Sequence, residues 1–225
     1  MKKQAWLILS VLGLVICLAG APAHAQDGRI SLFGGYSYGT NNFYSYDPQL
    51  NGYGLAVAFN LNKHIGLEAN FSGHNGSPVI DSAPASSTEN GYNEVLRQDL
   101  YTYTFGPKLS LPVGHFTLFT HFLVGGAHIH EGYTEKCIQS SGSDDTCYTP
   151  YSTSTRGNGF AFKTGGGVDW NHGHWGIRIL EVDYVRAELF TTETCPDCSA
   201  PESYSSSANN FELATGVTFN FGSTK

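Results

Sequence analysis

The 225-residue sequence has few charged residues and a single methionine. Charged residues make up 14% of the chain, and the methionine is the first residue. Beyond residue 25 there is no stretch of about 18 apolar residues, so no transmembrane helix is predicted there. Without the two lysines near the N-terminus, ten basic side chains face 19 acidic ones. A chain this acidic has no electrostatic attraction for nucleic acid, which excludes that class of partner.

One apolar segment does occur, at the N-terminus, and it has the form of a signal peptide. Two lysines precede an apolar run over residues 5–20, and Ala23 and Ala25 follow with one residue between them. Signal peptidase cleaves after small residues in this pattern. We expect cleavage of residues 1–25, which leaves residues 26–225 as one exported domain. A membrane anchor is disfavoured because the run is short and no basic residue flanks its far side.

Glycine and aromatic residues are abundant, with 27 Gly, 13 Tyr and 14 Phe. This composition suits many strands rather than helices. Period-two alternation of apolar and polar residues predicts eight strands. Their expected ranges are Ile30–Gly39, Gly52–Leu61, Ile65–Gly73, Gln98–Leu111, His115–His128, Asn158–Trp170, Trp175–Phe190 and Asn209–Phe221.

The connections between these segments alternate between long and short. Tight turns are expected at Asn62–His64, Pro112–Gly114 and Asn171–His174. The other connections are long and polar: Thr40–Asn51, His74–Arg97, Ile129–Gly157 and Thr191–Ala208. Transmembrane barrels have short turns on the periplasmic side and long loops outside. The fold class we predict is therefore all-β: an eight-stranded antiparallel up-and-down transmembrane β-barrel.

The two faces of the predicted strands support this fold. In the last strand Phe211, Leu213 and Val217 share one face, whereas Glu212 and Ala214 lie on the other. The polar faces carry many small residues, as the narrow interior of an eight-stranded barrel requires. Aromatic residues flank the tight turns and resemble an interfacial girdle: Phe59, Phe116, Trp170 and Trp175.

The last strand resembles the C-terminal assembly signal of bacterial outer-membrane proteins, with large aromatic residues three and five positions after a glycine, as in Gly216, Phe219 and Phe221. Together with Gly34-Gly35-Tyr36 and Gly165-Gly166-Gly167, it makes residues 30–221 similar to the OmpA-like eight-stranded outer-membrane barrels. The resemblance implies location in the cell outer membrane. It also implies contact with outer-membrane lipid and insertion by the barrel-assembly machinery.

Charged residues on the polar faces predict ion pairs inside the barrel. Glu68 and Lys108 lie at similar heights on adjacent strands. Folding the last tight turn places Lys163 opposite Val182, so that Glu181 and Asp183 flank it. His121 is also expected inside. Charges in a dry interior must pair, because an isolated buried charge is very costly. This placement requires a β-bulge near Ile179–Leu180. An ion-conducting path through these groups is the alternative.

Four cysteines remain after signal removal, in a compartment where disulfides form. We expect two local bridges in outer loops, one joining Cys137 to Cys147 and one joining Cys195 to Cys198. A metal site formed by these cysteines is the alternative, because two of them have Cys-x-x-Cys spacing. The pairs His128/His130 and His172/His174 have spacing that could bind a metal, but surface histidines are the preferred interpretation.

Catalysis is not expected. Lipid-modifying barrels use either a His-x-Ser pair, which this sequence lacks, or an N-terminal amphipathic helix, for which residues 26–29 are too few. The predicted function is structural or surface-interactive, with an interior plugged by side chains and with no metal or cofactor. The alternatives are a narrow porin-like channel, a lipid-modifying enzyme and a soluble ligand-binding barrel. The sequence identifies no surface ligand for the loops.

Overall fold

A computed structural model describes residues 29–41, 49–86, 90–139, 151–194 and 202–221. This part of the chain forms nine strands, all paired in antiparallel fashion. Their bounds are β1 Arg29–Asn41, β2 Gln49–Asn60, β3 Ile65–Gly76, β4 Val79–Ala83, β5 Gly91–Val113, β6 Phe116–Ile138, β7 Tyr151–His172, β8 Trp175–Thr194 and β9 Glu202–Phe221. The predicted signal peptide, with Ala23 and Ala25, lies outside the described residues.

Eight of these strands close into a ring. Strands β1, β2 and β3 pair in chain order, as do β5 to β9; β3 pairs directly with β5, and β1 pairs with β9. Strand β4 pairs with β5 alone and lies outside the ring. Closure satisfies the backbone hydrogen bonds of every barrel strand on both sides. The predicted eight-stranded up-and-down barrel is confirmed.

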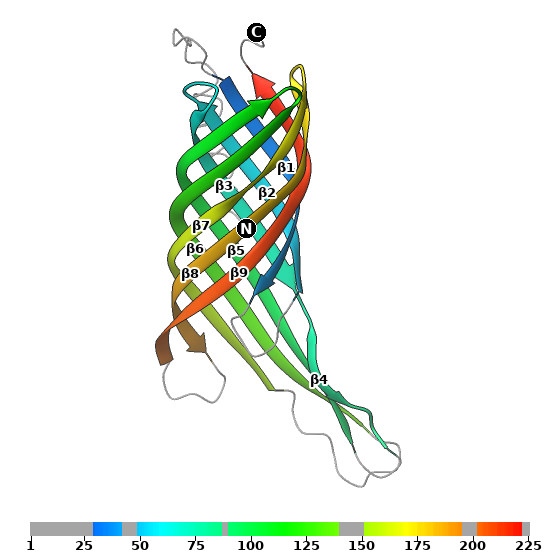
Figure 1. Ribbon diagram of the computed structural model, residues 1–225. Helices are drawn as coiled ribbons and strands as arrows, with labels where there is room; N and C mark the ends of the chain where they lie inside the picture. Colours follow the sequence, from blue (N-terminus) through cyan, green and yellow to red (C-terminus); the bar gives the residue numbers. More distant parts are fainter. Residues whose placement is uncertain (1–28, 42–48, 87–89, 140–150, 195–201, 222–225) are drawn as a thin grey trace.

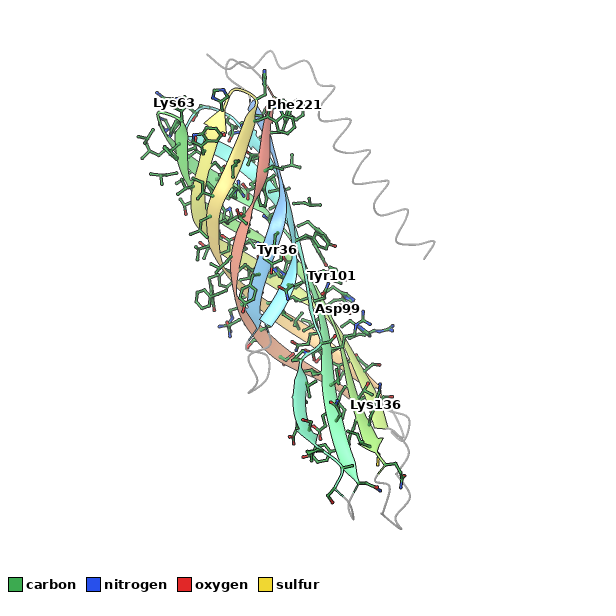
Figure 2. All side chains as sticks on the ribbon, turned by 90° about the vertical axis from the view of Figure 1, so that its right-hand side faces the viewer. Tyr36, Lys63, Asp99, Tyr101, Lys136 and Phe221 are labelled. Carbon is green, nitrogen blue, oxygen red and sulfur yellow. The ribbon has the colours of Figure 1, made fainter. Side chains whose placement is uncertain are left out.

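The tight turns and the ends of the described chain lie at one end of the barrel (Figure 1). Arg29 begins β1 there, and Phe221 ends β9 opposite Ile30. Two of the turns have a glycine with positive φ, 61° at Gly114 and 63° at Gly173. A two-residue hairpin turn requires a positive φ at its first position, and residues other than glycine rarely adopt that conformation. Figure 2 shows Lys63 and Phe221 at this end and Lys136 at the opposite one.

At the opposite end, part of the sheet continues beyond the ring as an outer extension. It consists of β4, the start of β5 (residues 91–97) and the end of β6 (residues 130–138), with the start of β7 (residues 151–155) paired to β6 (Figure 1). The sequence predicted loops over 74–97 and 129–157, and this was wrong for much of both ranges. Strands beyond a bilayer meet water on both faces, so their residues need not alternate and the period-two signal is lost.

The outward surface of the ring is apolar. Large hydrophobic side chains are exposed on every barrel strand; those over 50% exposed include Leu55, Phe105, Leu109, Phe122, Phe160, Trp175, Phe211 and Val217. Aromatic residues mark both edges of this belt. Trp170, Trp175 and Phe221 lie near the turns, whereas Tyr36 and Tyr101 lie farther toward the extension (Figure 2). Such a belt with aromatic edges matches the hydrocarbon core of a bilayer and its two interfaces.

The inward surface is mostly polar. Side chains of Glu68, His121, Lys163 and Arg178 are all almost completely buried. A soluble protein buries its apolar residues and exposes its charges, so the barrel has the reverse arrangement. No helix in the described ranges is long and apolar enough to cross a membrane.

The apolar belt predicts that a charge placed within it destabilises the barrel more than a charge placed outside it. Val182 faces outward near the middle of the apolar part of β8, and Thr192 faces outward on the same strand beyond it. Val182→Arg should lower the free energy of unfolding by about 2–4 kcal/mol, because the guanidinium must enter hydrocarbon. Thr192→Arg should leave it nearly unchanged. Urea unfolding in lipid vesicles measures both, and equal effects of the two substitutions would contradict the belt.

Candidate functional site in the barrel interior

Nine ionisable side chains gather inside the ring between the tight turns and its middle. We call them the interior charge network; its members are Glu68, Lys108, His121, Lys163, Asp169, Arg178, Glu181, Asp183 and Glu212. Each is at most 8% exposed. They come from β3, β5, β6, β7, β8 and β9, so only the closed ring brings them together.

Arg178 on β8 lies at the end of the network nearest the turns. Its Nε donates to Asp169 Oδ1 at 2.8 Å, and Nη1 donates to Glu181 Oε2 at 2.7 Å. The guanidinium also lies between two aromatic rings, 4.1 Å from the centroid of Phe33 and 4.3 Å from that of Phe119. Two carboxylates and two π faces therefore stabilise one buried cation.

A β-bulge makes this arrangement possible. The register between β8 and β9 shifts between Arg178 and Glu181, and both Ile179 and Leu180 face outward. The bulge predicted at these two residues is present. Because of it, Arg178 and Glu181 point inward although three positions separate them.

His121 connects the two halves of the network. Its Nδ1 lies 3.0 Å from Glu68 Oε1, and its Nε2 lies 3.0 Å from Asp183 Oδ1. A neutral imidazole can donate a hydrogen bond from only one nitrogen. The ring donates to both carboxylates only when it is an imidazolium, with a proton on each nitrogen. Lys108 donates to the other oxygen of Glu68 at 2.8 Å. The sequence placed Glu68 beside Lys108, and the structure joins them directly.

Lys163 lies farthest from the turns among the cations of the network. Its Nζ is 2.5 Å from Glu212 Oε2 and 3.3 Å from Asp183 Oδ2, and it donates to Asn70 Oδ1 at 3.2 Å. The sequence offered Glu181 or Asp183 as its partner. Asp183 contacts Lys163, as one of the two alternatives predicted, whereas Glu181 is bonded to Arg178. The sequence did not identify Glu212 as a partner of Lys163, because their contact depends on how β9 aligns on β8, where Glu212 lies opposite Asp183.

Glycines make room for these large side chains. A methyl group at Gly165 would collide with the Asp183 carboxylate, and one at Gly167 would meet the Phe119 ring. A cavity of about 10 Å³ remains beside Glu68, Lys108 and Arg178. This is room for about one water molecule.

An apolar layer covers the network on the side toward the extension. It is formed by Leu100, Ala127, Ile129, Ala161, Ala187, Leu189 and Ala208, each at most 2% exposed. Beyond this layer Gln98 donates to Glu131 at 2.5 Å. This apolar layer comes from β5, β6, β7, β8 and β9, so it lies between the ion pairs and the far end of the barrel on that side of the interior.

Three members of the network have the composition of a metal site. Glu68, His121 and Glu181 offer ligand atoms that lie within 4.8 Å of one another. However, Lys108 already binds Glu68 and Arg178 already binds Glu181. Ammonium and guanidinium groups at these positions repel a metal ion, so the geometry suits an ion-pair network better.

The other sequence-predicted residues lie outside the interior or outside the described residues. Cys137 at the end of β6 is disulfide-bonded. Cys147, Cys195 and Cys198 fall outside the described ranges, so both predicted pairings and the metal alternative stay predictions.

The residues of the expected assembly signal are in the final strand. Gly216 lies opposite Gly35, where a side chain would meet the β1 backbone. The Phe219 ring contacts Trp175 and Phe221, with ring centroids 4.6 and 4.5 Å away. Recognition by the assembly machinery stays a prediction.

Comparisons with known proteins gave matches among solved structures alone, since no protein-family model and no curated relative matches the chain. The attachment invasion locus protein Ail of Yersinia pestis, in complex with the heparin analogue sucrose octasulfate, is 15% identical with a TM-score of 0.49, over 87% of this chain and 100% of that one. Neisserial surface protein A is 9% identical with a TM-score of 0.42, over 87% and 100%. The outer membrane protein OprG from Pseudomonas aeruginosa is 10% identical with a TM-score of 0.44, over 88% and 98%.

These sequence identities and TM-scores are too low to support an argument. The conclusion that the chain spans a membrane therefore rests on the geometry of the barrel itself. An apolar belt surrounds a closed ring, and the buried side is charged and internally paired. Only a bilayer makes that outward surface favourable. This chain is a transmembrane β-barrel of the outer-membrane type. Its apolar belt faces lipid, and its charged interior is isolated from that lipid.

The network predicts the effect of removing one cation. Lys163→Met leaves Glu212 and Asp183 without their ammonium partner and should cost about 3–5 kcal/mol of unfolding free energy. Combining it with Glu212→Gln and Asp183→Asn should restore much of the loss. Combining it with Glu181→Gln should not, because Glu181 pairs with Arg178. Urea midpoints in detergent measure the series.

The exposed ion pair of Arg186 with Glu188 provides the matched control. Arg186→Met should hardly move the midpoint, because water screens that pair. If Lys163→Met is equally harmless, the lysine is hydrated and the network is not dry.

Proposed function

We propose that this protein is a resident outer-membrane barrel with a structural or surface-interaction role, rather than a channel or an enzyme. The observation that carries the proposal is the interior, in which buried ion pairs adjoin an apolar layer of side chains from five strands. The cavity within the network has room for about one water molecule, which does not favour the porin-like alternative. The histidine and carboxylates of the network are enclosed and engaged with each other, an arrangement that offers no access for a substrate.

The outer extension is the part of the described chain that suits contact with the surroundings. It projects beyond the belt and carries Lys136 (Figure 2). Other charged residues of the extension are Glu94 on β5 and Glu135 on β6. Tyr92 donates to Asp81 Oδ2 at 2.9 Å and joins β5 to β4 by a side-chain bond. The extension is therefore a paired sheet, which can present a defined surface at lower entropic cost than a loop.

Two lysines at opposite ends test this orientation. Lys136 lies on the extension and Lys63 on a tight turn, and both are exposed. A membrane-impermeant amine reagent should modify Lys136 in intact cells and Lys63 only after the outer membrane is permeabilised. Peptide mass spectrometry identifies the modified site.

The Lys136→Arg variant lacks the reactive amine at position 136, so the labelled peptide assigned to Lys136 should disappear in it. Labelling of Lys63 in intact cells would show the reverse orientation. A Lys136 that reacts only after permeabilisation would place the extension inside the cell envelope, and either result would contradict a surface role.

A further inference from the structure

Histidines are concentrated at the tight-turn end of the barrel. Four of the nine histidines in the chain are on or beside the three tight turns: His64, His115, His172 and His174. They lie outside the apolar belt, and all four are exposed. Neither the interior network nor the proposed surface role involves them.

One backbone bond recurs at all three turns. The carbonyl of His64 accepts from Ser110 N–H, that of His115 accepts from Asn171 N–H, and that of His174 accepts from Asn220 N–H, each at 2.7 Å. In every case the donor belongs to the next strand of the ring. These bonds fix each histidine backbone relative to the neighbouring hairpin.

Two of the imidazole rings repeat this connection. His64 Nδ1 lies 3.0 Å from Ser110 O, and His174 Nδ1 lies 2.9 Å from Asn220 O. Because a carbonyl oxygen only accepts, the Nδ1 of each ring is the protonated donor. These two rings therefore have a structural role that joins adjacent hairpins.

The third ring is placed differently. The His115 ring lies beside that of His172 on the neighbouring turn, with centroids 6.3 Å apart and planes inclined by 37°. His172 in turn stacks on Trp170, with centroids 5.9 Å apart and planes at 8°. Neither the His115 nor the His172 ring has a hydrogen-bond partner in the part of the chain that the structure describes.

We propose that His115 and His172 form a surface site for a divalent transition-metal ion such as Cu²⁺ or Zn²⁺. Two imidazole nitrogens from different turns supply the protein ligands, and water completes the coordination. Imidazole is a preferred ligand of both ions. The Asn171–His115 backbone bond holds the two turns together, and the Trp170 ring restricts the orientation of His172.

The spacing of the rings suits this role. With a metal–nitrogen distance of about 2.0–2.1 Å, the centroids of two imidazoles bound to one ion lie about 5.2 Å apart at a tetrahedral angle and about 6.4 Å apart at 180°. The observed 6.3 Å is near the upper limit, so a tetrahedral site requires the two rings to approach each other. Rotation of exposed side chains can shorten it without moving the backbone, because both residues are on the rim.

Metal titration of the folded protein in detergent tests the site. The protein must lack a polyhistidine tag, and all variants carry His130→Ala, which removes the outward pair of His128 and His130. Calorimetry with Zn²⁺ and electron paramagnetic resonance with Cu²⁺ should both detect one bound ion per chain, the latter with two nitrogen ligands. His115→Ala and His172→Ala should each weaken binding by roughly a hundredfold, because the second ligand acts at high effective concentration.

The other turn histidines are matched controls. His64→Ala and His174→Ala should leave metal affinity unchanged, since their Nδ1 atoms are bonded to strand carbonyls. Heat-shifted gel mobility confirms that each variant is folded. Absence of binding, or equal loss on removing His64 or His174, would overturn the proposal.

Discussion

Charge inside a narrow, dry ring is the constraint on which the rest of this structure depends. Burying an ion without a partner costs several kcal/mol, whereas a paired and hydrogen-bonded ion can be accommodated. The barrel meets this requirement with a continuous network in which every cation contacts at least one carboxylate. Arg178 bridges Asp169 and Glu181, His121 bridges Glu68 and Asp183, and Lys163 contacts Asp183 and Glu212.

Several local features of the backbone follow from this network. The bulge at Ile179–Leu180 lets both Arg178 and Glu181 point inward, and the glycines of β7 leave space for the side chains that face them. The closed ring of strands keeps the outward belt and the polar interior separate, with the network on the turn side of the interior and the apolar layer beyond it. Interaction with the surroundings is left to the extension and to the rim.

Local pairing was predictable from the sequence, and distant pairing was not. Counting residues from the tight turns predicts that Glu68 lies beside Lys108. The same count predicts the bulge at Ile179–Leu180. Both predictions need the register of only one or two hairpins. Glu212 joins Lys163 only after β9 has aligned on β8, a register that no tight turn sets. Arg178 was missed although it lies on the turn side of the bulge, where alternation with the exposed Trp175 and Ile177 points it inward. Strand β4 carries no alternation because it lies in water, so the sequence predicted a loop in its place.

The central claim is that paired side chains close this barrel, and conductance across a planar bilayer tests it most directly. The protein is inserted from detergent, its folded state is confirmed by heat-shifted mobility, and current is followed at both polarities. An eight-stranded barrel filled by ion pairs and an apolar layer should show no steady ion flow. Stable, stepwise currents that scale with the number of inserted molecules would show a continuous aqueous path and contradict the account.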